Sequence, residues 1–120
     1  MDVRFENLCR LFVEQAEVGI GWADGNGLVK YLNPALTKML GLAAPEETYD
    51  RPVFQFYKED TVSELEDHIL TTVMEKGVWT GELQLKPKNG DCYNTINFLF
   101  SMKDERNKLF SFGNIVIKKE

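Results

Sequence analysis

Histidine, cysteine and long apolar runs are scarce in this sequence of 120 residues. The two cysteines, Cys9 and Cys92, lie far apart and form no Cys-x-x-Cys pair. Neither a metal site nor a disulfide is therefore expected, and both cysteines should be buried as small hydrophobes. No apolar run is long enough to cross a bilayer, and residues 1–4 begin no signal peptide. These absences predict a cytoplasmic protein whose present segment makes no membrane contact.

Basic residues are outnumbered as well, with 14 Lys+Arg against 19 Asp+Glu and a formal net charge of −5. Nucleic-acid binding needs a basic stripe, and only the short run at residues 117–119 is basic. A catalytic site is not expected, because the serines have no nearby base and the single histidine, His68, is predicted to face solvent beside Glu64. The sequence therefore favours neither a nucleic-acid-binding protein nor an enzyme.

The sequence does contain the material for a core, because it is 43% hydrophobic and 12% aromatic. A chain of this length suits one domain and buries roughly two-thirds of its unfolded surface on folding. We therefore expect one packed globule rather than a disordered chain.

The first third of the chain predicts a helix followed by a hairpin. Apolar side chains recur at steps of three and four, as on one stripe of an amphipathic helix, at Phe5, Leu8, Cys9, Phe12 and Ala16. Residues 18–23 then alternate bulky with small side chains, as a strand does. Residues 24–27 (DGNG) carry a strong turn signal, and residues 28–32 resume as a second strand.

The middle of the chain predicts helices of different lengths. Asn33 and Pro34 favour the start of a short helix over residues 34–40. Residues 42–58 show no sustained period and predict short helical turns that fill space. Residues 61–64 (TVSE) have the form of a capping box and predict the start of the longest helix.

The last third predicts three strands, at residues 80–86, 92–102 and 109–117, joined by polar turns. A helix, two strands, further helices and three strands in this order indicate an α+β fold. Its sheet should be antiparallel, with the middle helices against one face.

Four short segments in this order carry a family resemblance: 24–35 (DGNGLVKYLNPA), 40–42 (LGL), 78–82 (VWTGE) and 88–90 (KNG). With them the chain resembles a PAS domain, the sensor module of signalling proteins such as histidine kinases and diguanylate cyclases. The resemblance implies a five-stranded antiparallel sheet in the order 2-1-5-4-3, with helices clasping one face around a small cavity. Residues 1–17 would form an N-terminal helical cap and residues 18–118 the PAS domain.

The chain departs from the family pattern in two places. Residues 117–119 (IKK) stand where members usually carry an aspartate-isoleucine-threonine triplet that leads to an output helix, and residues 49–52 replace an apolar residue and a glycine. Either the chain is cut from a longer protein or its coupling to an output domain differs.

No cofactor is predicted, although flavin and haem stay as alternatives. Light-sensing members carry an asparagine-cysteine pair where this chain has Pro52 and Val53, so a flavin photoadduct cannot form. Redox members of the family bind flavin without that cysteine, and Trp79 is compatible with such a domain. Haem-binding members use a histidine on the long helix. Their histidine lies more residues before the next strand than His68 does in this chain.

The family's register predicts that small and polar side chains face the helices and leave a hollow with hydrogen-bonding walls, suited to a small ligand. The residues predicted to face inward are Gly19, Gly21, Ala23, Tyr93, Thr95, Asn97, Ser111 and Gly113. The candidate ligand-binding residues are Leu83, Leu85, Tyr93, Thr95, Asn97 and Ser111.

In the same register, large apolar side chains face outward at Ile20, Trp22, Ile96, Phe98, Phe100, Phe110 and Phe112. A soluble protein must cover such a surface, and the helix over residues 5–16 and a second subunit are expected to do so. The candidate interface residues are Phe5, Leu8, Phe12, Trp22, Phe98 and Phe112. A shift by one residue would instead place the aromatic side chains in an ordinary core and expose the small polar ones.

We therefore expect a non-catalytic PAS sensor domain that binds a small ligand and signals through a homodimer to an output domain. One alternative is a ligand-free dimerisation module. A second alternative is a flavin- or haem-based redox or gas sensor.

Overall fold

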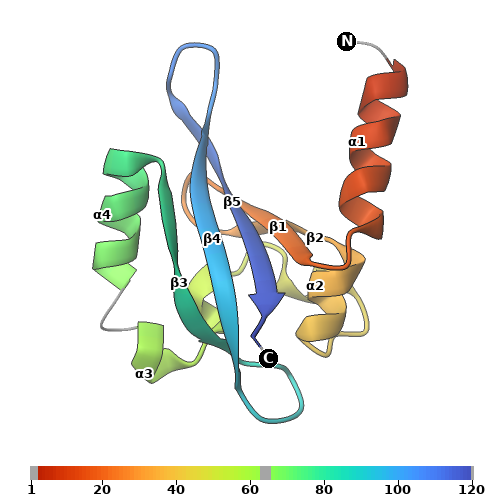
Figure 1. The fold of residues 1–120 in the computed structure, drawn as a ribbon, viewed down its shortest axis with the longest axis vertical. Helices are drawn as coiled ribbons and strands as arrows, with labels where there is room; N and C mark the ends of the chain where they lie inside the picture. The colour runs from red at the N-terminus through yellow and green to blue at the C-terminus, as the bar shows by residue number, and fades with distance from the viewer. Residues whose placement is uncertain (1–2, 63–65, 120) are drawn as a thin grey trace.

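Five antiparallel strands form one sheet in the computed structural model, which describes residues 3–62 and 66–119 (Figure 1). The strand order is β2-β1-β5-β4-β3, as the resemblance implied. The elements are α1 (Val3–Gln15), β1 (Gly19–Asp24), β2 (Val29–Leu32), α2 (Pro34–Met39), η1 (Pro45–Thr48), η2 (Val53–Phe56), α3 (Glu59–Val62), α4 (Glu66–Lys76), β3 (Val78–Leu85), β4 (Tyr93–Lys103) and β5 (Leu109–Lys118). Of the helices in the described residues, none combines the length and the apolar character needed to span a bilayer.

The predicted turn and cap in the first third are confirmed. The Gly27 N–H donates to the Asp24 carbonyl over 2.9 Å, and Gly27 adopts a φ of +80°, which glycine reaches without steric cost. The Asn33 side chain accepts the Leu36 N–H at the start of α2, with proline at the first helical position. Local sequence signals therefore fix the hairpin and the short helix that follows it.

The start of the long helix differs from the prediction. Thr61 and Val62 already lie inside α3 rather than at the cap of a new helix. The other residues of the predicted capping box, Ser63 and Glu64, lie outside the described residues. Helix α4 carries Ile69 and Val73 at helical spacing, and both side chains are fully buried.

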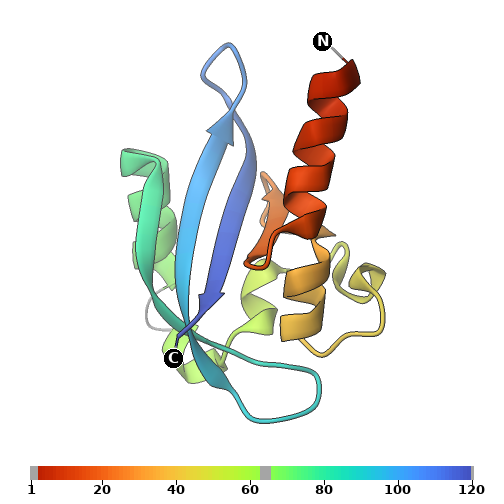
Figure 2. The same cartoon turned by 45° about the vertical axis from the view of Figure 1, so that its right-hand side comes forward.

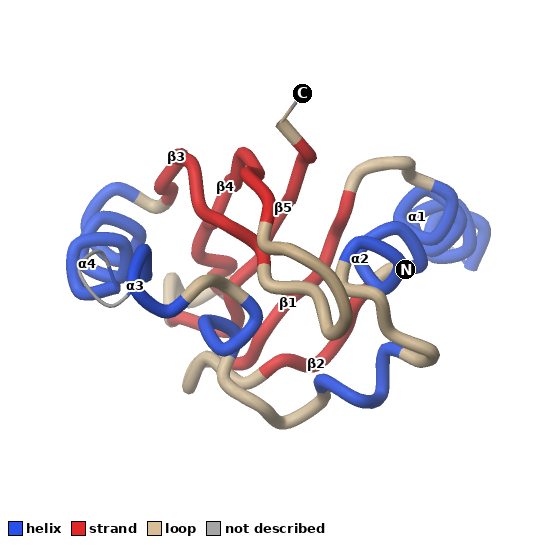
Figure 3. The backbone as a smooth tube through the Cα atoms, turned by 90° about the horizontal axis from the view of Figure 1, so that it is seen from below, coloured by secondary structure: helices blue, strands red, loops and turns tan. Residues whose placement is uncertain are grey.

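The segment over residues 50–58 connects the two edges of the sheet. Its start pairs with edge strand β2, where the Val29 N–H donates to the Arg51 carbonyl over 2.9 Å and the Val29 carbonyl accepts from Asp50 over 2.8 Å. Its end pairs with edge strand β3, where the Lys58 N–H donates to the Gln84 carbonyl over 2.7 Å. Figure 3 shows α3 and α4 at the β3 end of the curled sheet and α2 at the β1 end.

A β-bulge lies at the start of β5. Met102 pairs with Ser111, but Lys103 pairs with Leu109, so Phe110 has no partner on β4. An extra residue of this kind shifts every following side chain to the other face of the sheet.

Because of this bulge, Phe112 faces inward and is only 8% exposed, as part of the hydrophobic core. The predictions that Phe112 points outward and that Ser111 and Gly113 point inward are wrong. The Phe100 ring covers Gly113 on the outer face, where an added Cβ would lie 2.4 Å from the ring. On β1 and β4 the predicted faces are correct, since Thr95 is fully buried and Trp22 is exposed.

Helix α1 stands beside α2 and leaves the outer sheet face uncovered (Figures 1 and 2). Its predicted apolar stripe is exposed in this chain, with Phe12 77% and Leu8 58% exposed. Cys9 lies on the same stripe and is exposed as well, and Cys92 is only half-buried, so the prediction that both cysteines are buried is wrong. The physical reason is that α1 packs beside α2 instead of on the outer sheet face, so its stripe contacts no apolar surface among the described residues of the same chain.

Candidate functional site

A chain of buried hydrogen bonds crosses the inner face of the sheet. The Asn114 Nδ2 on β5 donates to the Tyr57 hydroxyl over 2.8 Å, and that hydroxyl donates to Asn97 Oδ1 on β4 over 2.6 Å. The Asn97 Nδ2 then donates to the Thr95 hydroxyl over 2.9 Å, which donates to the Leu83 carbonyl on β3 over 2.8 Å. Burial makes such a network costly to break.

Tyr57 fills the part of the hollow that the sequence predicts beside Thr95 and Asn97. Its side chain comes from the segment over residues 50–58 and is only 3% exposed. Burial raises the pKa of the Tyr57 hydroxyl far above its ordinary value, against a smaller lowering by the Asn114 amide. The Tyr57 hydroxyl therefore stays protonated at physiological pH and continues to donate its hydrogen bond to Asn97 Oδ1.

A partly open cavity of about 350 Å³ lies next to this network, towards β1. It is bounded by the β1–β2 turn, the inner faces of β1 and β5, the segment over residues 50–58, and α4. Apolar side chains make up most of the wall, including Leu32, Leu36, Leu99, Phe112, Leu70 and Met74. Helix α4 forms the wall of the cavity that borders solvent, because Met74 on this helix is 47% exposed.

Asn114 is the one buried polar side chain among the described residues that line this cavity. The other side chains in the wall that carry a polar group, Trp22, Asn26 and Glu66, are exposed. Asn114 is 8% exposed, and its Oδ1 atom is buried without a hydrogen-bond partner. A buried acceptor without a partner is costly and points to a missing group.

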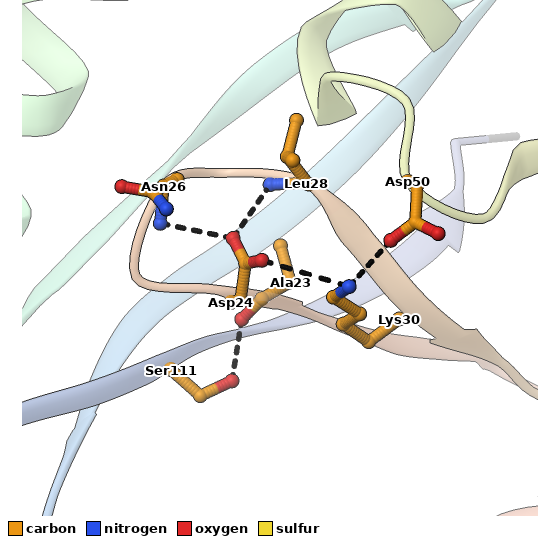
Figure 4. A network of polar contacts seen from close by, with 7 residues as sticks. All are labelled: Ala23, Asp24, Asn26, Leu28, Lys30, Asp50 and Ser111. Atoms are coloured by element: carbon orange, nitrogen blue, oxygen red, sulfur yellow. Dashed lines mark hydrogen bonds and ion pairs between the residues drawn. The ribbon is translucent and has the colours of Figure 1, made fainter.

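Polar contacts hold the turn that forms one wall of the cavity (Figure 4). Asp24 Oδ1 accepts the backbone N–H groups of Asn26 and Leu28 over 2.9 and 3.1 Å. The hydrogen bond from the Leu28 N–H is the main reason that the pKa of the Asp24 carboxyl lies below its ordinary value. Lys30 bridges Asp24 and Asp50, which ties the turn to the segment over residues 50–58.

The cavity lies beside the predicted ligand-binding residues rather than among them. None of these six residues lines it: Leu83, Leu85, Tyr93, Thr95, Asn97 and Ser111. Tyr93 instead donates to the Met39 carbonyl over 2.7 Å, and Ser111 donates to the Ala23 carbonyl. Asn97 and Leu83 line a void of only about 10 Å³.

The sequence reasoning missed Tyr57 and Asn114. Asn114 could have been found as an amide in step with Phe112 and Val116, once the register of β5 was right. Tyr57 had no such signal, because residues 42–58 have no periodicity that would assign it to a face.

The cavity wall offers neither a thiol nor an imidazole among its described residues. Pro52 and Val53, which stand where the resemblance places the reactive cysteine of light-sensing members, line the cavity. His68 is exposed on α4, and its predicted partner Glu64 lies outside the described residues. These residues fit neither a covalent flavin adduct nor axial ligation of haem.

Similar folds occur in several solved structures. The PAS domain of a protein from Colwellia psychrerythraea superposes with a TM-score of 0.88 at 16% identity, covering 96% of this chain and 97% of that one. A PAS domain from a two-component sensor histidine kinase gives a TM-score of 0.78 at 13% identity, covering 98% of this chain and 100% of that one. At these identities the likeness shows the fold alone.

An RNA-binding light-oxygen-voltage receptor also shares the fold, with a TM-score of 0.85 at 16% identity. The match covers 98% of this chain but 34% of the receptor chain. No curated protein sequence matches closely enough to count as a relative. The sequence does match the family described as PAS fold over residues 7–103, which is most of the chain, and the protein therefore belongs to the PAS family.

Proposed function

We propose that this PAS domain is a non-catalytic sensor that binds a small ligand in the cavity of about 350 Å³. The observation that supports this most directly is a mainly apolar cavity with a buried, unpartnered amide oxygen on Asn114. Cavities of about 300 to 1,000 Å³ with a few polar groups are typical of small-molecule sites.

The proposed mechanism is a population shift. A ligand in this cavity contacts α4 on one side and β5 on the other, so it stabilises the arrangement of helix and sheet that fits it best. A dimer contact would then carry the change to an output domain of a larger signalling protein, such as a histidine kinase or a diguanylate cyclase.

A variant that fills the cavity tests ligand binding. Ala23 is 3% exposed and lines the cavity, so Ala23→Leu places a larger side chain in the ligand's space. Ala43→Leu makes the same chemical change at an exposed loop position and serves as the control. The measurement is thermal unfolding with a panel of neutral, acidic and basic small molecules.

A compound at a hundred times its Kd should stabilise the wild-type protein by about 2.7 kcal/mol. The Ala43→Leu control should keep this stabilisation, and Ala23→Leu should lose it. If no compound stabilises the wild-type protein, or if Ala23→Leu responds as the control does, ligand sensing in this cavity is wrong.

The second candidate function is a ligand-free dimerisation module. It is favoured by the exposure of large apolar side chains, with Phe12 77% and Phe110 72% exposed. The two functions differ in one respect: a pure dimerisation module assembles in the same way with Ala23→Leu and with every compound of the panel.

A haem sensor or a flavin sensor that forms a cysteine adduct is the least supported function, because the cavity wall lacks a cysteine or histidine among its described residues. Both cofactors are coloured, so a visible absorption spectrum of freshly purified protein tests for them. We propose that the spectrum shows no cofactor band and that the parent protein acts in the cytoplasm.

A further inference from the structure

The orientation of the buried amides follows from one carbonyl group. The Leu83 carbonyl can only accept, so the Thr95 hydroxyl must give its proton to it. The Thr95 oxygen then accepts from Asn97, which places the Asn97 Nδ2 towards Thr95 and the Asn97 Oδ1 towards Tyr57. Each hydrogen bond in this chain therefore fixes which atom of the next side chain donates and which accepts.

The same reasoning identifies the free atom of Asn114. Tyr57 has one proton, and it is used on Asn97 Oδ1 over 2.6 Å. The Tyr57 oxygen must therefore accept, so Asn114 turns its Nδ2 towards it over 2.8 Å. The atom left over is Asn114 Oδ1, which is an acceptor and has no partner.

A water molecule is a poor partner for this atom, because an ordered buried water needs two to four polar partners. Asn114 also lines the void of about 10 Å³, which is at the lower limit of the space that one water needs, and the Asn97 and Tyr57 side chains beside that void already bond each other. Among the described residues in the cavity wall, Asn114 is the one polar side chain that is buried, and the surrounding side chains Leu36, Leu99 and Phe112 are apolar. An apolar molecule with one donor group matches this wall better than water does.

The wall also restricts the ligand's charge and size. A buried cation or anion needs a charged or multiply hydrogen-bonding partner, and the buried part of the wall offers one neutral amide. A volume of about 350 Å³ is at the small end of ligand sites, which run from about 300 to 1,000 Å³. A neutral molecule of one or two rings fits these limits.

We propose that the cavity selects a neutral, mainly apolar small molecule that donates one N–H or O–H hydrogen bond to Asn114 Oδ1. This inference rests on the proposed ligand-sensing function and goes further by naming the ligand's chemical class. Asn114 thereby becomes the residue that determines specificity.

Two isomeric probes test the donor requirement: 3-methylindole, which has an N–H donor, and 1-methylindole, in which a methyl group replaces it. The isomers have the same atoms, so the cavity must accommodate the same volume. Isothermal titration calorimetry of the wild-type protein should show about tenfold tighter binding of 3-methylindole. NMR should show a larger shift of the Asn114 side-chain amide with 3-methylindole than with 1-methylindole.

The Asn114→Leu variant should bind both isomers with equal affinity, because the acceptor is gone. Gln84→Leu removes an amide from the outer face of β3 and should keep the wild-type preference. If Asn114→Leu does not fold, the calorimetric and NMR comparison on wild-type protein decides alone.

Equal affinities in the wild-type protein, binding of neither isomer, or a preference that persists in Asn114→Leu would each overturn the inference. The wider proposal of ligand sensing survives those results if another compound of the panel stabilises wild-type protein but not Ala23→Leu. It falls only if no compound does so.

Discussion

One hydroxyl group, that of Tyr57, joins two buried amides on neighbouring strands. It donates to Asn97 and accepts from Asn114, and all three side chains are at most 8% exposed. Removing the hydroxyl leaves an amide oxygen and an amide N–H without partners in the core. A buried polar group without its partner costs about 1–3 kcal/mol.

We therefore predict that Tyr57→Phe lowers the free energy of unfolding by about 2 kcal/mol. Tyr49→Phe is the matched control, because Tyr49 is only half-buried, and it should change stability by less than about 0.5 kcal/mol. Urea unfolding followed by circular dichroism measures both. Equal stability of the two variants would show that the network contributes no net stability.

The sequence could predict single residues only where a local rule applies to them. Asn33 was predicted as a cap because it precedes a proline and an apolar period, and the cap is observed. Thr95 and Asn97 were placed on the correct face, yet their partner Tyr57 was not found. That partner lies 40 residues from Asn97, and long-range pairs of this kind leave no local pattern.

At the scale of elements, the Asn33 side chain joins α1, β1 and α2. Its Oδ1 accepts from Leu36 and Ile20, both over 2.9 Å, and its Nδ2 donates to the carbonyls of Val13 and Val18 over 2.9 and 3.1 Å. Asn33 is fully buried. The orientation of α1 depends in part on these last two bonds.

Asn33→Ala should lower the free energy of unfolding by about 2–3 kcal/mol, since it removes a helix cap and leaves buried backbone groups unpaired. Hydrogen exchange of the α1 amides should accelerate more than that of β4. Asn7→Ala, at an exposed position on α1, controls for the change of side chain. Unchanged exchange in α1 would mean that Asn33 does not hold this helix.

Element types were largely predictable, and strand register was not. Turns at residues 24–27 and 89–90 and the alternation in β1 and β4 follow from side-chain chemistry within a few residues. The register of β5 depends on whether the turn before it adds a residue, and Phe110 does so. This one bulge reversed the predicted faces of Ser111, Phe112 and Gly113, and with them the predicted wall of the cavity.

At the scale of the whole molecule, two apolar surfaces are uncovered. One is the stripe of α1, with Phe5 56% and Phe12 77% exposed, and the other is the outer sheet face around Trp22, which is 39% exposed. Exposed apolar patches of this kind mark interaction sites. A second copy of the chain would cover one surface with the other.

We predict that the wild-type protein is a dimer and that Phe12→Glu makes it a monomer, because the variant places a charge in the apolar contact. Asn7→Glu adds the same charge at a polar, exposed position of α1 and should leave the dimer intact. Size-exclusion chromatography with light scattering measures the mass. Wild-type protein that elutes as a monomer, or equal masses for both variants, would contradict the proposed contact.

The segment over residues 50–58 has a consequence for assembly. Free edge strands are templates on which other chains add β-strands, and this route leads to aggregation. Here the backbone N–H and carbonyl of Val29 on β2 and the backbone carbonyl of Gln84 on β3 are already occupied by this segment. At these positions neither edge can pair with a strand from another copy, so the sheet cannot be lengthened sideways there.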